Sequence, residues 1–495
     1  MSKVIPIIFL SLFVFGTSLA QNKRAALDKY FSTLAKNQRL NGNVLVAENG
    51  NIVYQKSFGY ADFGNKRLNT YSSTFPIMSI TKTFTSTAIL QLKEQGKLKV
   101  TDFVAAYLPH FPYPNITITH LLSHTSGLRP YDDYFDSLHH VYPDSVFTNK
   151  DILPKYATVQ LPLLFQPGEK FYYDNINFIF LAIIIEKLSG MPFKEYVATH
   201  IFKPAGMLHT YIPASPFYQW SREERKDMSA LYRYPHLYSD RLERVDTVAF
   251  VSQYWRAYNF SGEGEIISST GDLLKYDAAL YNGTLLNQKS LDEAFTPVIL
   301  NNGQINSFSS GLGWLVEEDS AMGKTVRYMG GAFGLRSHLR RNISKHQAVI
   351  IVDNTQNEID DVAGNALKIL NGQMIKPTGK SLAKKYGRLL VDKGATVANT
   401  ALQQLKNDTL SYSIDENEFN SLGYDFIAND KMKEALLTFK QTISLFQTSW
   451  NAYDSYGEAL LKNGYKEKAI VMYKKSVELN PGNEGGKKVL EELSK

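Results

Sequence analysis

The stretch that decides the fold reads Phe75-Pro-Ile-Met-Ser79-Ile-Thr-Lys82-Thr-Phe-Thr-Ser-Thr-Ala-Ile-Leu90 and continues to Gly96. Its apolar residues recur at helical spacing, and a glycine is a common C-terminal stop of a helix. Residues three apart lie on one helix face, so the pattern places the Lys82 amine beside the Ser79 hydroxyl in the first turn. A serine hydroxyl is a poor nucleophile without a base within reach. Ser79 and Lys82 are therefore a candidate nucleophile and its proton-transfer partner.

The Ser-x-x-Lys spacing is weak support by itself. It occurs again at Ser381-Leu-Ala-Lys384, in a polar stretch after Pro377 that we interpret as a solvated linker. For Ser79 taken alone, a polar helix cap explains the residue as well as catalysis does. Other motifs have to decide between the two interpretations.

A second motif follows at Tyr173-Asp174-Asn175, after a Pro-Gly turn and before an apolar run that ends at Gly190. The pattern predicts a loop that leads into a buried helix. A phenol can shuttle a proton, and an amide can orient a lysine or a substrate carbonyl. The chain has 30 tyrosines, so a purely structural Tyr173 is the alternative.

Two histidines, His120 and His124, lie four residues apart between these motifs. This spacing can indicate a metal site on a helix. No third ligand stands nearby, and the following Thr-Ser-Gly favours a loop. We therefore expect neither a metal nor another cofactor.

Taken together, the motifs resemble those of the serine β-lactamase and penicillin-binding protein superfamily, in its class C-like branch of β-lactamases, D-alanine peptidases and esterases. The resemblance runs from about Gly42 to Met374. The matching stretches are Gly42–Gly50, Pro76–Lys82, His120–Leu128, Pro167–Asn175, Gly262–Asp272 with Leu280–Gly283, Gly311–Trp314 and Arg327–Gly334.

The resemblance implies a role for each matched residue. Ser79 is the nucleophile that becomes acylated, Lys82 lowers the cost of its deprotonation, and Tyr173 accepts and donates the proton. Asn175 holds the lysine and contacts the substrate amide. The backbone N–H groups of Ser79 and Gly331 form the oxyanion hole.

The third motif departs from the family pattern of Lys or His, any residue, then Gly. Tyr328 stands at the Lys or His position, followed by Gly330. In relatives that act on β-lactams or D-alanyl peptides, this position helps to recognise a substrate carboxylate. A neutral phenol binds an anion more weakly than a cation does. We expect Tyr328 to weaken carboxylate recognition, and Arg336 is a candidate replacement or else a solvated strand residue.

The first twenty residues have the pattern of a secretory signal peptide, with an apolar run from Val4 to Gly16 and a small-x-small cleavage site ending at Ala20. We predict export to the periplasm or the exterior. No later run reaches 18 apolar residues, so we expect no membrane span in the mature chain. The 495 residues contain no cysteine and no dense basic block, and the net charge is only +6. Disulfides are therefore excluded, and nucleic-acid binding has no support.

The expected fold class is α+β, an antiparallel sheet flanked by helices plus a helical lobe, followed by an all-α repeat domain. Asn49-Gly50 predicts a hairpin between strands at 43–48 and 52–58, and 326–328 and 346–352 are further expected strands. A Tyr- and Trp-rich stretch either forms a wall of the substrate cleft or packs a loop-rich lobe; its members are Tyr218, Trp220, Tyr232, Tyr234, Tyr238, Tyr254, Trp255 and Tyr258.

Beyond Pro377 the chain shows a period of 34 residues, seen in the pairs Gly423/Gly457, Ala435/Ala469 and Phe439/Tyr473. This period is typical of tetratricopeptide repeats. We expect a signal peptide at 1–20, a hydrolase domain at 21–375, a linker and helix at 376–415, and repeats at 416–495. The repeats either bind a protein partner or pack against the catalytic domain.

Two functions compete on this sequence. The first is an exported serine hydrolase that acts through a Ser79 acyl-enzyme on a small-molecule or peptide substrate with a β-lactam, amide or ester bond. The second is a non-catalytic penicillin-binding-like protein whose repeats recruit a partner. The presence of Ser79, Lys82, Tyr173 and Asn175 together favours the hydrolase, because a binding protein has no chemical need for all four.

Overall fold

The computed structural model describes residues 7–142, 144–213, 227–251, 258–375 and 378–494. The chain forms two compact units. The first unit comprises 1–35, 39–233 and 244–375, and the second comprises 36–38, 234–243 and 376–495. The first unit ends at 375 and leaves out 36–38 and 234–243, and the hydrolase domain expected at 21–375 stays a prediction.

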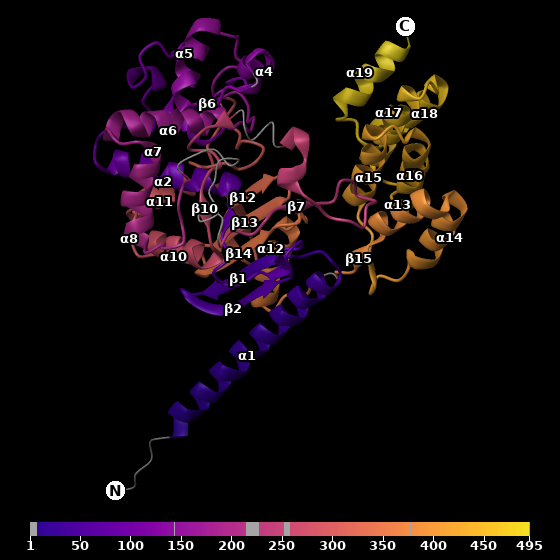
Figure 1. Cartoon of the computed structure of the whole chain (residues 1–495), viewed down its shortest axis with the longest axis horizontal. Coiled ribbons are helices and arrows are strands. Elements are labelled where there is room, and N and C mark those ends of the chain that lie inside the picture. The colour runs from indigo at the N-terminus through magenta and orange to yellow at the C-terminus, as the bar shows by residue number, and fades with distance from the viewer. Residues whose placement is uncertain (1–6, 143, 214–226, 252–257, 376–377, 495) are drawn as a thin grey trace. The chain divides into compact units, whose positions relative to one another are not determined.

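The first unit is built on a six-stranded antiparallel sheet with the order β11-β12-β13-β14-β1-β2 (Figure 1). The strands are β1 (Gly42–Glu48), β2 (Asn51–Phe58), β11 (Leu315–Asp319), β12 (Gly323–Ala332), β13 (Leu335–Asn342) and β14 (Gln347–Asp353). β1, the first of these strands in the sequence, thus lies beside β14, the last of them in the sequence. This arrangement confirms the predicted α+β class.

The turn between β1 and β2 confirms the predicted hairpin. Asn49 and Gly50 have φ values of 52° and 74°, the left-handed conformation that a type I′ turn requires at both central positions. Asparagine and glycine adopt this conformation at the lowest cost. The short turn fixes the register, in which Glu48 pairs with Asn51.

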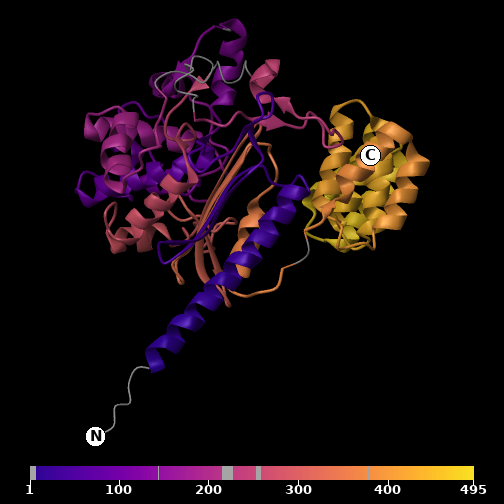
Figure 2. The same ribbon diagram turned by 60° about the horizontal axis from the view of Figure 1, so that its bottom comes forward.

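Both faces of the sheet are buried, because alternate residues of its central strands enter two different cores. Val44 and Ile351 face the core that contains α1 (Ile7–Lys36) and α12 (Asp360–Leu370). Leu45 and Ile350 face the larger core that contains the helical lobe. Figure 2 shows α1 crossing the first of these faces. The helices therefore lie on both sides of the sheet, as the sequence predicts.

The helical lobe is centred on α2 (Thr81–Glu94) and α6 (Ile176–Ser189), which contact one another. α6 ends at Gly190 in the left-handed conformation, which confirms the predicted stop. The other helices of the first unit are η1 (Met78–Ile80), η2 (Val104–Ala106), α3 (Ile118–Leu122), α4 (Asp132–Val141), α5 (Asn149–Val159), α7 (Phe193–Val197), η3 (Ala198–Phe202), α8 (Lys203–Ala205), η5 (Val245–Thr247), α10 (Thr270–Tyr281) and α11 (Gln288–Ala294). Its short strands are β3 (Tyr60–Asp62), β4 (Arg67–Leu68), β5 (Phe75–Pro76), β6 (Phe147–Thr148), β7 (Tyr232–Arg233), β9 (Tyr258–Asn259) and β10 (Ile267–Ser268), and β8 (Glu243–Arg244) spans a unit boundary.

The aromatic stretch between 191 and 260 packs in several places. The Tyr232 hydroxyl donates to Asp62, and the Tyr258 ring packs against Phe260. Tyr238 belongs to the second unit. These contacts favour the packing interpretation for the described members, whereas Tyr218, Trp220, Tyr254 and Trp255 lie outside the described residues.

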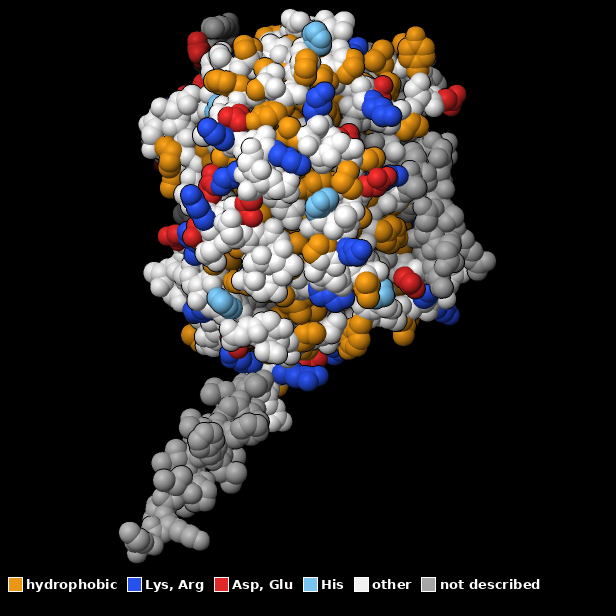
Figure 3. Space-filling model, turned by 90° about the vertical axis from the view of Figure 1, so that its left-hand side faces the viewer, with side chains coloured by type: hydrophobic (Ala, Val, Ile, Leu, Met, Phe, Trp, Pro, Cys, Tyr) orange, Lys and Arg blue, Asp and Glu red, His pale blue; other side chains and the backbone are white. Residues whose placement is uncertain are grey.

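Within the described residues, no single helix has the length and hydropathy needed to cross a bilayer. Among the helices that the structure describes, only α6 taken together with 193–205 meets that test, and this pair is bent by 76°. On the face of the molecule in Figure 3, basic and acidic side chains are interspersed with apolar ones.

The second unit is helical, with a short parallel pair of strands, β15 (Lys380–Ser381) and β16 (Tyr412–Ser413). Its helices are α13 (Leu382–Lys393), α14 (Ala395–Leu405), α15 (Glu416–Ala428), α16 (Met432–Leu445), α17 (Trp450–Lys462), α18 (Lys466–Leu479) and α19 (Glu484–Leu493). The helix expected within 376–415 is two helices, because Gly394 (φ 82°) interrupts it. The described part of the expected linker and helix at 376–415, which starts at 378, belongs to this unit.

The predicted 34-residue period appears as two helical hairpins, α15–α16 and α17–α18. A Cβ at Gly423 would lie 2.4 Å from the Phe439 ring, and a Cβ at Gly457 would lie 3.1 Å from the Tyr473 ring. Each glycine thus lets an aromatic ring of the second helix pack closely on the first. The period therefore has a packing cause, while the tetratricopeptide assignment stays a prediction.

The second unit also includes Tyr234–Glu243, a piece of chain that leaves the first unit and returns to it; we call it the inserted segment. The backbone N–H of Leu237 donates to the Asp425 carboxylate on α15 at 2.7 Å. The Tyr238 ring stacks on Phe426, with the centroids 4.8 Å apart. The core of the helical unit is therefore completed by residues from the middle of the sequence.

Candidate active site

Ser79 lies in η1, a single 3-10 turn that runs directly into α2. The sequence predicts the first turn of the α-helix here, and the structure places the serine just before it. Met78 precedes it with a φ of 48°, although methionine rarely adopts a left-handed backbone. Such strain persists only where the surroundings hold it, and it is common at functional sites.

The Ser79 hydroxyl lies between the two predicted proton-transfer groups. Lys82 Nζ is 3.1 Å from Ser79 Oγ, and the Tyr173 hydroxyl is 2.8 Å from the same oxygen. Lys82 Nζ also lies over the Tyr173 ring, 5.2 Å from its centroid. Tyr173 is 44% exposed, so the group is reachable from solvent. The structure thus brings together three residues that are up to 94 positions apart in the sequence.

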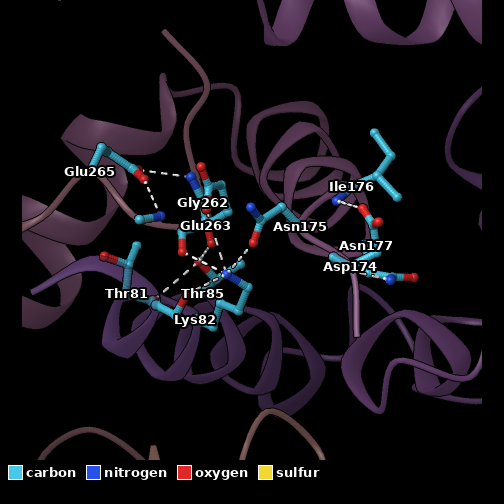
Figure 4. Close-up of polar contacts among 12 residues, drawn as sticks. Thr81, Lys82, Thr85, Asp174, Asn175, Ile176, Asn177, Gly262, Glu263 and Glu265 are labelled. Carbon is cyan, nitrogen blue, oxygen red and sulfur yellow. Dashed lines mark hydrogen bonds and ion pairs between the residues drawn. The ribbon is translucent and has the colours of Figure 1, made fainter. Parts of the chain in front are cut away.

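Lys82 is fully buried, and its amine contacts Asn175 and Glu263 (Figure 4). Nζ donates to Asn175 Oδ1 at 2.8 Å and to the backbone carbonyl of Glu263 at 2.8 Å. These oxygens can only accept, so they take two N–H bonds and leave the remaining position of the nitrogen facing Ser79. The predicted role of Asn175 in holding the lysine agrees with this contact.

Ser381 serves as an internal comparison for the Ser-x-x-Lys spacing. It is the N-cap of α13, and its hydroxyl accepts from the backbone N–H of Lys384 at 3.1 Å. Ser79 instead meets the Lys82 side chain and makes no cap hydrogen bond. The cap interpretation therefore does not describe Ser79. The interpretation of Ser381 as part of a solvated linker is wrong, because this residue is buried and caps a helix.

The Glu263 side chain was not among the predicted site residues. Its carboxylate lies 3.6 Å from Lys82 Nζ and is 22% exposed. The neighbouring Glu265 holds the loop in place, because its carboxylate accepts from the N–H groups of Gly262 at 2.7 Å and Gly264 at 3.0 Å. Burial raises the pKa of Glu265 to about 7. The contact between Glu263 and Lys82 spans 181 residues, and a backbone carbonyl carries no signal in the sequence.

Tyr328, the unusual residue of the third motif, lies on β12 and is only 4% exposed. Its hydroxyl is 3.1 Å from His124 Nε2, and Tyr173 is close enough to affect it electrostatically. Burial, followed by the neighbouring Tyr173, raises the pKa of Tyr328 well above its ordinary value. The phenol is therefore neutral and faces the predicted proton shuttle, while its contact with a substrate carboxylate stays a prediction.

His120 and His124, whose spacing in the sequence suggests possible metal ligands, make different contacts. His120 caps α3, with Nδ1 accepting from the backbone N–H of Thr117 at 3.2 Å. His124 is buried behind Tyr173, with the ring centroids 4.5 Å apart. Burial, and then the positive charge of Lys82, lowers the pKa of His124 well below its ordinary value. Among the described residues, no group of three or more His, Cys, Asp or Glu could hold a metal ion.

The glycines of the third motif bring β12 against the serine turn. A Cβ at Gly330 would lie 2.2 Å from the carbonyl oxygen of Ile77, so only glycine fits this contact. Ser337 on β13 pairs with Gly330 on β12, and its hydroxyl donates to the same carbonyl at 2.8 Å. The strand that carries Gly331 is thereby fixed beside Ser79, and the oxyanion-hole role of Gly331 stays a prediction.

Arg336 is already paired. Its guanidinium donates to Glu358 Oε1 at 3.0 Å and to the backbone carbonyl of Leu335 at 3.0 Å. The side chain is 27% exposed. Its predicted role as a substitute carboxylate anchor would require competition with Glu358.

Comparison with known proteins agrees with this geometry. Residues 27–374 match the model of the Beta-lactamase family. Penicillin-binding protein 4* of Bacillus subtilis is 34% identical over 351 residues, which cover 69% of this chain and 74% of the relative. The structure of a penicillin binding protein from Bacillus halodurans superimposes with a TM-score of 0.56 at 24% identity, covering 69% of this chain and 98% of that one. The structure of a D-amino acid amidase from Ochrobactrum anthropi superimposes with a TM-score of 0.54 at 19% identity. The match covers 72% of this chain and 98% of that one.

The family match covers more than half of the chain, and it contains Ser79, Lys82, Tyr173 and Asn175, which the structure assembles around one hydroxyl. The two likenesses to solved structures support the fold alone. The chain belongs to the β-lactamase family of serine hydrolases, within the serine β-lactamase and penicillin-binding protein superfamily.

Proposed function

We propose that this enzyme hydrolyses an ester, amide or β-lactam bond through an acyl-enzyme on Ser79. The observation that carries the proposal is the position of Ser79 Oγ, 3.1 Å from Lys82 Nζ and 2.8 Å from the Tyr173 hydroxyl. A hydroxyl held between a buried amine and a phenol can lose its proton as it attacks a carbonyl carbon.

The residues allow a balanced two-step reaction. As Ser79 Oγ bonds to the carbonyl carbon, its proton passes to the Lys82–Tyr173 pair, which then gives a proton to the departing oxygen or nitrogen. Backbone N–H groups of Ser79 and Gly331 would stabilise the oxyanion of the tetrahedral intermediate. Water then attacks the acyl-enzyme, delivers a proton to the same pair, and releases the acid and free Ser79.

The charges of the site favour substrates without a carboxylate next to the reacting bond. Tyr328 supplies a neutral donor in place of a cation, and Arg336 is engaged by Glu358. A charge-assisted hydrogen bond contributes about 1.5–3 kcal/mol and a neutral one about 1 kcal/mol. We therefore expect small neutral esters to be turned over with higher kcat/KM than penicillins or D-alanyl-D-alanine peptides.

The proposed location is the periplasm or the exterior, on the basis of the apolar N-terminal run and the small-x-small site at Ala20. Intact-mass analysis of the protein recovered from its native cell type tests this. We expect a mature chain that begins at Gln21, and a full-length chain in the cytosol would contradict export.

Intact-mass spectrometry after incubation with a fluorophosphonate and, in parallel, with a penicillin tests the chemistry. The fluorophosphonate should add once to the wild type and not to Ser79→Ala, whereas Ser381→Ala should be labelled like the wild type. Failure to label the wild type would favour the alternative, a non-catalytic protein whose helical unit recruits a partner. Efficient penicillin turnover would contradict the proposed preference for neutral esters but not the acyl-enzyme.

A further inference from the structure

Behind Tyr173 lies a buried line of polar contacts that the reaction scheme above leaves unused. It runs from the backbone N–H of Asp174 to His124 and then to Tyr328, which has Tyr173 as its electrostatic neighbour. His124 is 1% exposed and Tyr328 is 4% exposed. Solvent therefore has little access to these contacts, and each polar atom depends on its neighbour in the line.

The contacts fix the direction of donation. A backbone N–H can only donate, so His124 Nδ1 accepts from Asp174 at 3.3 Å. The side-chain amide nitrogen of Asn177 faces the same ring nitrogen at 3.5 Å. A neutral imidazole has one N–H, which must then be on Nε2, 3.1 Å from the Tyr328 hydroxyl. Tyr328 therefore accepts from His124 and has its own O–H free to donate to Tyr173.

A donor at this point acts on the reacting oxygen of Tyr173. When Tyr173 releases a proton to the departing group, negative charge grows on the Tyr173 oxygen, and a hydrogen bond aimed at that oxygen stabilises the charge. The same bond fixes the phenol, so that its hydrogen-bonding direction toward Ser79 is kept at 2.8 Å. Positioning of this kind can contribute as much to the rate as direct chemistry does.

The backbone of His124 is consistent with a demand for this side chain at this place. Its φ is 57°, a left-handed conformation that asparagine and glycine adopt more readily than histidine does. Its ring also faces the Tyr173 ring, 4.5 Å away between centroids. An unfavourable conformation is thus maintained where the imidazole meets both tyrosines.

We propose that His124 and Tyr328 are positioning residues that form a neutral hydrogen-bond relay, in which His124 orients Tyr328 and Tyr328 donates to the Tyr173 oxygen during acylation of Ser79. The relay deepens the proposed function and rests on it. It gives the unusual tyrosine of the third motif a task inside the proton-transfer machinery, and it assigns His124 to the reaction rather than to packing alone.

The decisive test compares two replacements of His124 in two backgrounds. His124→Gln can place an N–H near the position of Nε2, whereas His124→Asn suits the left-handed backbone but is too short to reach Tyr328. Each is made in the wild type and in Tyr328→Phe. The readouts are the second-order rate of fluorophosphonate labelling at Ser79, the kcat and KM for p-nitrophenyl butyrate, and the melting temperature.

Loss of one aligned hydrogen bond should lower the acylation rate by about tenfold. Tyr328→Phe should show this loss in kcat and in the labelling rate, with KM nearly unchanged. His124→Gln should be faster than His124→Asn, and this advantage should vanish in Tyr328→Phe, because His124 acts through the Tyr328 hydroxyl. His124→Gln should not exceed His124→Asn in melting temperature, so stability cannot explain the order of rates.

Three outcomes would overturn the relay. They are a wild-type labelling rate in Tyr328→Phe, an effect of Tyr328→Phe on KM alone, and an advantage of Gln over Asn that persists without the Tyr328 hydroxyl. His120→Asn is the matched control, because it makes the same change at the neighbouring histidine, which only caps α3. Labelling of wild type but not Ser79→Ala keeps a failure of the relay distinct from a failure of the proposed function.

Discussion

Lys82 has more partners than a surface lysine, and this determines how its loss should act. Its amine contacts Ser79, Asn175 and both the carbonyl and the carboxylate of Glu263. The lysine is therefore part of a hydrogen-bonded cluster around the Ser79 hydroxyl. Tyr173 is the other proton-transfer group that contacts this hydroxyl. Groups that act as a unit lose their function together.

We expect Lys82→Ala and Tyr173→Phe each to lower kcat by roughly 10²–10⁴, the usual range for general acid–base groups. The double variant should be little slower than the slower single variant, because one proton-transfer unit can be lost only once. Steady-state kinetics on p-nitrophenyl butyrate measure all three. Losses that multiply would show that the two side chains act independently.

Asp174 lies between Tyr173 and Asn175 in the second motif. Its titration makes the free energy of unfolding depend on pH. Burial raises the pKa of Asp174 to about 7. In the unfolded chain the carboxyl has its ordinary value of 3.8, so between about 4 and 7 the folded state binds more protons than the unfolded state. The contribution of Asp174 to the free energy of unfolding therefore falls as pH rises through this window, and it is constant above it.

Asp174→Asn keeps an oxygen that can accept from the Ile176 N–H and removes the titration. We expect the variant to gain stability relative to the wild type as pH rises from 4 to 7, which melting temperatures across this range measure. Asp292→Asn, a change of the same type at an exposed helix position, is the control. A pH dependence as steep as that of the wild type would contradict the assignment.

At the scale of elements, the site depends on how closely β12 approaches η1. A Cβ at Gly330 would lie 2.2 Å from Ile77 O and 2.3 Å from Ser337 Oγ, whereas a Cβ at Gly331 meets only the flexible end of Arg336, at 3.3 Å. The two adjacent glycines thus have unequal tolerance. The distance between the strand and the serine turn is set by the first of them.

We expect Gly330→Ala to reduce kcat by at least tenfold, because the strand and the turn must separate and a displacement of about 1 Å can cost 10²-fold. Gly331→Ala should lose much less. The kcat of p-nitrophenyl butyrate hydrolysis and the melting temperature of each variant are the measurements. Equal losses in the two variants would show that contact with the turn does not limit the reaction.

Elements with a local pattern could be predicted from the sequence. The β1–β2 hairpin follows from Asn49-Gly50, and α6 follows from its apolar run and Gly190. β13 is less evident, because Arg340 and Arg341 are buried in it. Their charges are met by acidic residues far along the chain, Arg341 by Asp277 on α10. No local pattern indicates such a partner.

The same distinction holds within the site. Ser79 and Lys82 are three residues apart, so helical spacing is enough to pair them. Glu263 reaches Lys82 across 181 residues, and His124 reaches Tyr328 across 204. Those contacts arise only when the lobe folds onto the sheet, and the left-handed backbone of His124 has no signature in residue type.

At the scale of the whole molecule, the proposed catalytic residues and the helical unit are separate in sequence. The matched site residues, from Ser79 to Arg336, all precede 375, where the first unit ends. The inserted segment is the exception to a simple division, since Leu237 and Tyr238 pack with α15. Removal of the C-terminal part therefore leaves the site residues in place but exposes apolar side chains of the inserted segment.

We expect a chain that ends at Met374 to keep most of its kcat on p-nitrophenyl butyrate, and to aggregate more readily than the full chain. Leu237→Ser with Tyr238→Ser in the shortened chain should restore solubility, because the two side chains lose their packing partners in any case. Turnover and light scattering are the measurements. A shortened chain that is folded and soluble but inactive would show that the helical unit helps to form the active site.

The inserted segment also imposes an order of events during synthesis. It leaves the ribosome well before its packing partners, because Asp425 follows Leu237 by 188 residues. At 5–20 residues per second, the segment waits roughly 10–40 s for them. During that interval Leu237 and Tyr238 have no helical partner and stay available to a chaperone or a protease.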